Sequence, residues 1–142
     1  MFELHPQLNK DTFTIGELPL CRVLVMNDRQ FPWLILVPQQ SFIREIYELN
    51  TEDQKALNEE SISVSELLMN HYNGDKLNIG ALGNLVPQLH IHHIVRFKHD
   101  IAWPKPVWGQ VTPKPYTKLQ KQKISTELQT LMKANILGFK PC

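Results

Sequence analysis

The chain has 142 residues and a formal net charge of +1 at pH 7, with 42% hydrophobic and 20% charged side chains. This composition is that of an ordinary globular domain, and it excludes a disordered or fibrous chain. It also lacks the concentrated basic surface that binding of long nucleic acids requires. The longest apolar run, Trp33 to Val37, is far shorter than the ~20 residues of a membrane span.

The N-terminal residues and the cysteines indicate the cellular compartment of the protein. Residues 1–6 have neither the basic start nor the apolar core of a signal peptide. Cys21 and Cys142, the two cysteines, show no metal-ligand spacing, which fits a chain with reduced thiols. We therefore predict a cytoplasmic protein with no membrane association.

Two strands are predicted near the start of the chain. Cys21–Met26 reads as a buried strand, and after the turn Asn27–Gln30 the longer run Phe31–Pro38 fits the centre of a sheet. We expect these strands to form an antiparallel hairpin. Residues 1–20 hold turn formers and short apolar segments, and no regular element is predicted there.

Two helices and a third strand follow. Ser41–Leu49 carries four apolar residues at helical spacing and predicts a short helix. Thr51 and Gln54 have the spacing of a capping box, which predicts a second helix from Thr51 to about Tyr72. Lys76–Ile79 is predicted as a strand.

Three of the six histidines lie within four positions of one run, Gln88-Leu89-His90-Ile91-His92-His93-Ile94-Val95-Arg96. The run alternates like a strand, so Gln88, His90 and His92 should share one face and His93 the other. The glycines of the preceding loop, Asn78–Asn84, let backbone amides approach a ligand closely. The pattern indicates an anionic group that is held by amides and met by an imidazole.

The last third of the chain completes the predicted fold. Trp103–Gly109 and Pro113–Pro115 predict a stiff, extended path, and Thr117–Ile136 predicts a final helix. We predict an α+β fold, with a helix between the strands of an antiparallel sheet and a C-terminal helix. Residues 1–112 would form the domain, and residues 113–142 a helical extension packed on it.

The stretch Asn78–Arg96 resembles the signature of the histidine triad (HIT) family, whose strand reads His-φ-His-φ-His-φ-φ, with φ apolar, after a glycine-containing loop. Gln88 takes the first histidine position, His90 the middle one and His92 the last, while His93 stands where the family has an apolar residue. The wider resemblance covers roughly residues 13–110. It implies a HIT-like fold, a homodimer, and a nucleotidyl-histidine formed by the middle histidine.

These roles have a chemical basis. A neutral His90 imidazole can attack the α-phosphorus, and His92 could donate a hydrogen bond to a non-bridging oxygen. Gln88 could orient a phosphate or the leaving oxygen, but an amide cannot transfer a proton. Alternatively, Gln88 only binds a neighbouring segment. His93 is expected to be a hydrogen-bonded packing residue or a subunit contact.

The resemblance also implies a nucleotide-binding set: Asn27, Asp28, Asn78, Gly83, Asn84 and Trp103. Asp28 could accept from two ribose hydroxyls, although Asn-Asp is also ordinary turn chemistry. Asn78, Gly83 and Asn84 match the loop that contacts phosphate. Trp103 and Trp108 could stack on a base or cover the pocket, or they could simply anchor the chain.

We therefore expect a hydrolase or nucleotidyl transferase. Its substrate would be a purine nucleotide derivative, such as a dinucleoside polyphosphate or a nucleoside phosphoramidate. The covalent route requires no cofactor, although a divalent cation could accompany a polyphosphate. Two alternatives remain: a nucleotide-binding protein without turnover, and a metal site of His90, His92 and another histidine.

Overall fold

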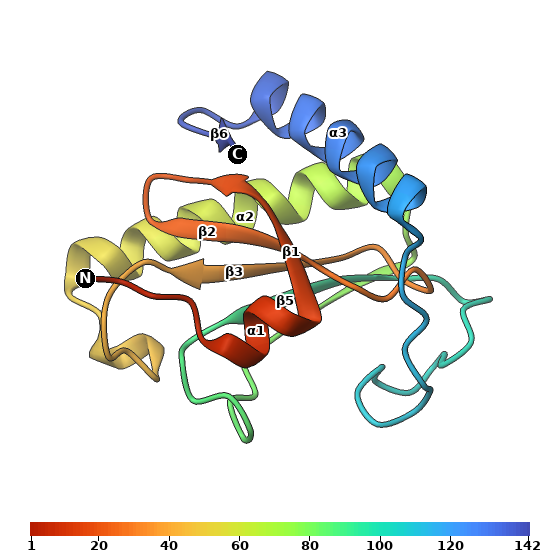
Figure 1. The fold of residues 1–142 in the computed structure, drawn as a ribbon, viewed down its shortest axis with the longest axis horizontal. Coiled ribbons are helices and arrows are strands. Elements are labelled where there is room, and N and C mark those ends of the chain that lie inside the picture. Colours follow the sequence, from red (N-terminus) through yellow and green to blue (C-terminus); the bar gives the residue numbers. More distant parts are fainter.

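The computed structural model describes residues 1–142 and contains one six-stranded antiparallel sheet with the strand order β4-β5-β3-β2-β1-β6 (Figure 1). The strands are β1 (Thr12–Glu17), β2 (Cys21–Met26), β3 (Trp33–Pro38), β4 (Lys76–Gly80), β5 (Ile91–Arg96) and β6 (Lys140–Pro141). The helices are α1 (Pro6–Asp11), η1 (Ile46–Glu48, one 3₁₀ turn), α2 (Thr51–Tyr72) and α3 (Lys118–Asn135). The predicted α+β fold is confirmed.

The predicted hairpin forms the centre of the sheet. β2 pairs with β3 from Cys21↔Pro38 to Val25↔Leu34, and every residue of β3 is buried. β5 then adds to the far side of β3, with Trp33 opposite Ile94. The strand rich in histidine therefore lies inside the sheet, between β3 and β4.

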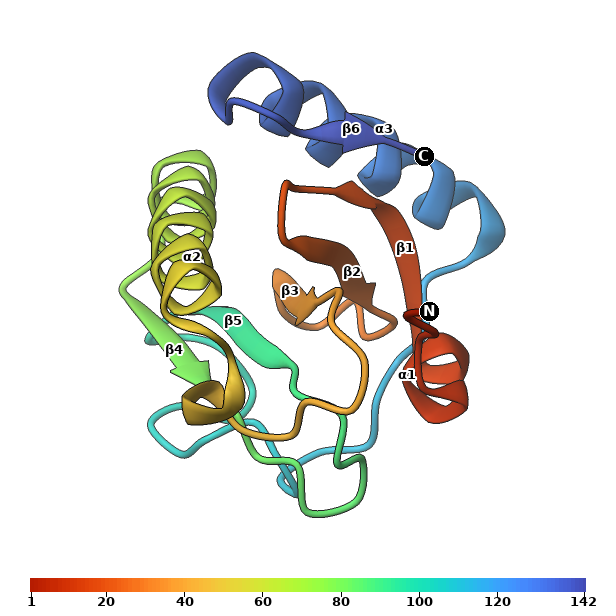
Figure 2. The ribbon, with the colours of Figure 1, turned by 90° about the vertical axis from the view of Figure 1, so that its left-hand side faces the viewer.

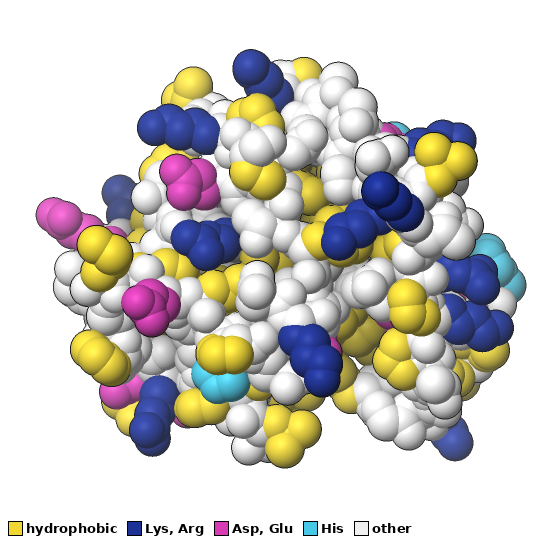
Figure 3. Space-filling view, viewed as in Figure 1, with side chains coloured by type: hydrophobic (Ala, Val, Ile, Leu, Met, Phe, Trp, Pro, Cys, Tyr) yellow, Lys and Arg dark blue, Asp and Glu magenta, His cyan; other side chains and the backbone are white.

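The sheet separates two apolar layers (Figure 2). α2 and α3 cover one face, where their side chains join a core of 21 buried residues. α1, the N-terminal residues and the 97–112 segment cover the other face, over ten buried residues that include Leu8, Trp33 and Ile94. On the side shown in Figure 3, Lys and Arg side chains are spread over the whole face, while most of the visible Asp and Glu side chains lie on its left half. No helix is long and apolar enough to cross a lipid bilayer.

Three short elements, β1, β6 and α1, were not predicted from the sequence. β1 is a short run that becomes a strand by pairing with β2, and the two residues of β6 pair with the end of β1. α1 begins at Pro6, where His5 Nδ1 accepts from the Gln7 N–H and caps the helix. This helix is six residues long and buries one side chain, Leu8, so its periodicity is weak.

The predicted helix over Ser41–Leu49 is wrong. The segment forms turns with a single 3₁₀ turn, and Phe42 has φ +60° with its ring exposed. Leu49 and Ile43 pack against the larger core, whereas Phe42 and Ile46 face solvent. The apolar spacing that suggested a helix therefore does not describe one buried face.

Two boundaries also differ from the prediction. Asn50, not Thr51, caps α2, since its side chain accepts from the Asp53 N–H, and Gln54 instead donates to the Leu49 carbonyl. The predicted histidine strand is regular only from Ile91. Trp103–Gly109 lies in a series of turns that follow Asp100 rather than in the predicted extended path, whereas Pro113–Pro115 forms no turn.

Two buried polar groups join α2 to the sheet. Both oxygens of Glu60 accept backbone N–H groups, from Leu20 at 2.8 Å and from Cys21 at 2.9 Å. Burial raises the pKa of this carboxyl, although the two backbone hydrogen bonds act to lower it. The contacts place the middle of α2 over the start of β2.

The second polar contact between α2 and the sheet is made by His93, which is completely buried. Its Nδ1 donates to the Ile91 carbonyl, so the neutral ring accepts from the Ser61 hydroxyl at Nε2, over 2.7 Å. Burial lowers the pKa of His93 to about 4. His93 is thus a hydrogen-bonded packing histidine, as one of its two predicted roles stated.

We predict that Glu60→Ala lowers the free energy of unfolding by about 2–6 kcal/mol, because two buried N–H groups lose their acceptor at about 1–3 kcal/mol each. Urea denaturation measures this. Glu59→Ala removes the same charge from the neighbouring exposed position and should change stability by less than about 0.5 kcal/mol. Equal effects of both variants would contradict the assignment.

We also predict that His93 makes the free energy of unfolding decrease at acid pH. The pKa of His93 is lowered in the folded state, so below about pH 6.5 the unfolded chain binds the extra proton and stability falls until about pH 4. Between pH 7.5 and pH 5 this amounts to about 2 kcal/mol. His93→Gln should remove that share of the pH dependence in urea titrations. Parallel curves for the two proteins would show that His93 does not titrate in this way.

Candidate active site

His90 and His92 lie on the sheet face opposite α2. Leu89, Ile91 and Val95 belong to the core under α2, whereas Ile94 belongs to the core under α1. The predicted alternation of faces is therefore confirmed, even though His90 precedes the first regular residue of β5. The two imidazoles are neighbours, with ring centroids 5.1 Å apart.

The tautomer of His90 is determined by its own backbone. Nδ1 lies 2.7 Å from the carbonyl oxygen of Gln88, which can only accept, so Nδ1 carries the proton. In the neutral ring, Nε2 then has a free lone pair. The orientation by a main-chain carbonyl is what a nucleophilic imidazole requires.

His92 has the opposite tautomer. Its Nδ1 accepts from the Trp33 indole N–H at 2.9 Å, so the proton of the neutral ring is on Nε2. Burial, with smaller contributions from His90 and His93, lowers the pKa of His92 to about 3. His92 therefore stays neutral at physiological pH and presents an N–H donor beside the lone pair of His90.

The space at His90 is narrow. The ring is 7% exposed and lines a hollow of about 10 Å³ with Arg44, Glu45 and the loop Ala81–Gly83. That volume is close to what one water molecule needs. The loop is exposed along its length, and Gly83 adopts φ +73°, a conformation that glycine allows without strain. Asn84 is exposed beside it.

Gln88 also lines that hollow, and backbone groups bind its side-chain amide. Its Oε1 accepts from the His5 backbone N–H at 2.9 Å, and its Nε2 donates to the Glu3 carbonyl at 2.8 Å. Both ends of the amide are therefore bound to the N-terminal segment. These contacts match the alternative in which Gln88 binds a neighbouring segment, while its backbone carbonyl orients His90.

Asn27 and Asp28 lie in the turn after β2. Oδ1 of Asp28 accepts from the Gln30 backbone and side chain, both at 3.0 Å, and from the Lys114 N–H at 3.3 Å. Asn27 accepts from the Tyr116 N–H. Turn chemistry is thus present at both residues, and Asp28 Oδ2 makes no hydrogen bond within the protein.

Asn78 and Trp103 belong to a network around Arg96. This buried guanidinium forms two hydrogen bonds to Asp100, donates to Asn78 Oδ1 at 2.8 Å and lies 5.7 Å from the Trp103 ring centroid. Burial acts to raise the pKa of Asp100, but the bonds from Arg96 and from backbone N–H groups outweigh it and lower the pKa to about 2. Trp103 thus packs beside Arg96 at the C-terminal end of β5, whereas His90 precedes the N-terminal end of this strand.

Two tryptophans that the sequence did not connect to the histidines contact His92. Trp33 holds its tautomer, and Trp108 lies with its ring centroid 5.3 Å away, packed against Gly80. The Trp108 indole N–H is buried and has no hydrogen-bond partner. Only the register between β3 and β5 brings Trp33 to His92, so residue spacing alone gives no signal for this contact. No group of three or more His, Cys, Asp or Glu side chains is arranged to hold a metal ion.

Comparisons with known proteins agree with this geometry. The HIT domain family matches residues 7–99. A histidine triad protein from Marinobacter aquaeolei VT8 is 53% identical, covering 95% of this chain and 98% of that one with a TM-score of 0.92. Histidine triad proteins from Bradyrhizobium japonicum and Sinorhizobium meliloti 1021 are 43% and 40% identical, cover 95% and 96% of this chain and 98% of each of theirs, and both have TM-scores of 0.88. No curated protein sequence matches the chain significantly. The chain belongs to the histidine triad family.

Proposed function

We propose that the protein is a nucleotide hydrolase or nucleotidyl transferase that cleaves the α-phosphate bond of a nucleoside phosphate derivative through a covalent nucleotidyl-histidine on His90. HIT proteins are in general nucleotide hydrolases or transferases. The observation that carries the proposal is the pair of opposite tautomers, with a bare Nε2 on His90 beside an N–H on Nε2 of His92.

The proposed reaction has two steps. The lone pair of His90 Nε2 attacks the α-phosphorus, a P–N bond forms, and the bond to the leaving group breaks with its electron pair on the leaving atom. The His92 N–H stabilises charge on a non-bridging oxygen. Water or another acceptor then attacks the phosphorus and releases His90. The neutral imidazole attacks in the first step and leaves in the second, and between the steps Nε2 holds the phosphorus while Nδ1 keeps its proton, which fits the tautomer of His90.

The nucleoside would bind at the Asp28 end of the site. Asp28 Oδ2, which has no partner in the protein, can accept from ribose hydroxyls of a purine nucleotide, and the loop with Gly83 and Asn84 can supply backbone N–H groups to the phosphate. Binding of a phosphate requires this exposed loop to widen the hollow at His90. The covalent route needs no metal, although a divalent cation could accompany a polyphosphate.

We predict that a reaction with α-labelled nucleotide, quenched early, leaves label on the protein. The adduct should be labile to acid and stable to hydroxylamine, as a P–N bond is, and His90→Ala should abolish it. His99→Ala removes an exposed histidine and serves as the matched control. Ligand-induced thermal stabilisation without label or product, across a panel of nucleotides, would instead identify a binding protein without turnover.

The proposal includes a homodimer in which the sheet continues across the subunit boundary. β4 is an edge strand whose Ile79 is exposed, and Ile62 is exposed on α2. We predict that Ile79→Lys converts a two-chain particle into a one-chain particle in light scattering. Ile101→Lys, at another exposed isoleucine in a turn, should leave the mass unchanged. A wild-type mass of one chain at micromolar concentration would contradict the dimer.

A further inference from the structure

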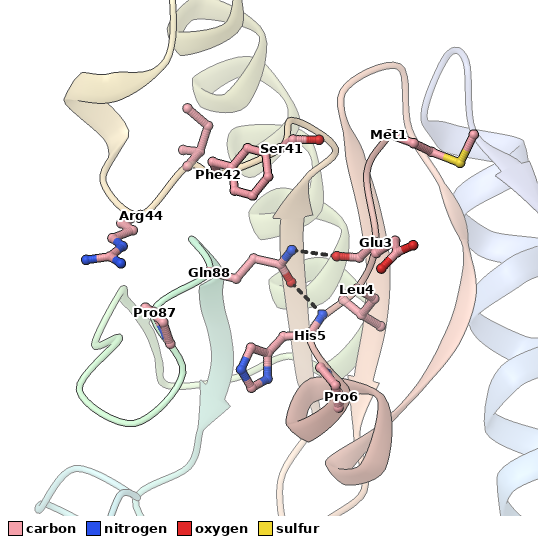
Figure 4. A pocket seen from close by; sticks show the side chains of 11 residues that line it. Met1, Glu3, Leu4, His5, Pro6, Ser41, Phe42, Arg44, Pro87 and Gln88 are labelled. Atoms are coloured by element: carbon pink, nitrogen blue, oxygen red, sulfur yellow. Dashed lines mark hydrogen bonds between the residues drawn. The ribbon is translucent and has the colours of Figure 1, made fainter.

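Two hollows of the molecule lie apart from each other. A cavity of about 420 Å³ adjoins the small space at His90 and belongs to the site described above (Figure 4). Another hollow, of about 310 Å³, lies between α3 and the turn after β2, and we call it the α3 hollow. It shares no residue with the spaces at His90. Its lining consists of Arg29, Tyr116, Gln120, Lys123, Ile124 and Glu127.

Charge is unevenly distributed along the chain. Residues 101–142 contain seven lysines and a single acid, Glu127, so this part of the chain has a net charge of +6, although the whole chain has +1. The first hundred residues are therefore net acidic. The near-neutral total, from which we expected no concentrated basic surface, conceals this segregation. α3 and the path that leads to it belong to the basic part.

The basic side chains gather where the turn after β2 meets α3. The Arg29 N–H donates to the Lys114 carbonyl at 2.8 Å, so the path into α3 is held against this turn. The start of α3 lies on the right in Figure 1, and the right half of the same view in Figure 3 shows Lys and Arg side chains with few acidic ones. We call the exposed cations of this region the α3 basic surface: Arg29, Lys114, Lys118, Lys121 and Lys123.

These cations have no counter-charge within the protein. The two ion pairs of the molecule, His71–Glu127 and Arg96–Asp100, use none of them. Glu127, the one acid that lines the α3 hollow, already binds His71 over 2.6 Å. The first turn of α3 contains Lys118 and no acid, although a cation there opposes the helix dipole. Folding of the helix therefore does not explain this charge.

The α3 hollow also presents donor groups that have no acceptor in the protein. Gln120 uses only Oε1, which accepts from the Thr117 N–H, and its Nε2 is left to face solvent. The Tyr116 hydroxyl, the Arg29 guanidinium and the Lys123 ammonium line the same space. A carboxylate accepts several hydrogen bonds at once, and a guanidinium can bind it through two parallel bonds. The hollow is therefore suited to a carboxylate.

Other polyanions match this surface less closely. Single-stranded nucleic acids stack their bases on aromatic side chains, and Tyr116, the one aromatic residue of the hollow, packs its ring edge-on with Phe13 at 5.8 Å. A lipid surface would meet the projecting lysines without filling the hollow. The side chain of an acidic residue can enter it, with its methylene groups against Ile124 and its carboxylate at the donors.

We propose that the α3 basic surface docks an acidic segment of a partner protein. One Asp or Glu side chain enters the α3 hollow, where Arg29, Tyr116 and Lys123 bind its carboxylate, and neighbouring acids lie against the other lysines. α3 covers the sheet face opposite to His90, so the partner leaves the nucleotide site open. The docking does not depend on the proposed nucleotidyl-histidine.

Fluorescence anisotropy of a labelled decaglutamate peptide tests the docking surface. We expect saturable binding at low ionic strength that weakens as salt is added. Arg29→Glu combined with Lys123→Glu should weaken binding by at least about tenfold, since hydrogen bonds to charged groups are lost and repulsion is added. Tyr116→Phe removes one donor without changing the charge and should weaken binding by about threefold.

The control is a second double variant, Lys55→Glu with Lys133→Glu, which changes the net charge equally at exposed positions outside the surface. It should weaken binding by less than about twofold, and thermal melting checks that every variant folds. Equal weakening by the two double variants would show that the peptide follows net charge, and absence of saturable binding at low salt would refute the docking surface.

Competition distinguishes the class of partner. Unlabelled oligouridylate and phosphatidylglycerol vesicles are each added to the bound labelled peptide. We expect both to need a higher concentration of anionic groups for displacement than unlabelled decaglutamate does. Displacement at a lower concentration by either competitor would overturn the assignment of an acidic protein segment, in favour of nucleic acid or of a lipid surface respectively.

Discussion

The site depends on one hydrogen bond, from the Trp33 indole to Nδ1 of His92. An indole nitrogen can only donate, so this contact excludes a proton from Nδ1 and keeps it on Nε2. Protonation of the ring would put two donors against each other in a buried setting, in addition to the burial that already lowers the pKa of His92 to about 3. The neighbouring His90 has its proton fixed on the other nitrogen by a carbonyl. The Gln88 carbonyl thus makes Nε2 of His90 an acceptor, and the Trp33 indole makes Nε2 of His92 a donor.

A glutamine two residues before His90 is consistent with this arrangement. Orientation of His90 uses the backbone carbonyl of residue 88, which any side chain at that position supplies. The side chain is then free for another task, and here it joins the N-terminal segment to the start of the histidine strand. A histidine has two ring nitrogens, and it could not reproduce the amide's simultaneous donation to Glu3 and acceptance from His5 in the same geometry. Gln88 therefore holds the backbone of the N-terminal segment against the start of the histidine strand.

The sequence predicted the parts of the fold that local patterns determine. The alternation around His90 correctly predicted which side chains share a face, because the side-chain period of a strand is fixed, and the long apolar run of β3 correctly predicted a central strand. β1 and β6 form by pairing with strands that are distant in sequence, which local patterns do not reveal. The Ser41–Leu49 segment connects β3 to α2 through turns and one 3₁₀ turn, although its apolar residues have helical spacing. Likewise Trp33, His5 and Arg44 reach the site through register and chain path, which residue spacing does not encode.

The distribution of cations constrains how a polyphosphate can bind. Arg96, three residues beyond His93, is buried and neutralised by Asp100, whose lowered pKa keeps it ionised, so this guanidinium holds the turn and is not available to a phosphate. Burial keeps His92 neutral, and Arg44 is the one Lys or Arg side chain that lines the spaces at His90. The several negative charges of a polyphosphate must then be balanced largely by backbone N–H groups and by cations that arrive with the substrate. A polyphosphate that arrived with a divalent cation would bring part of its own charge neutralisation, and the protein offers no ligand cluster for that ion.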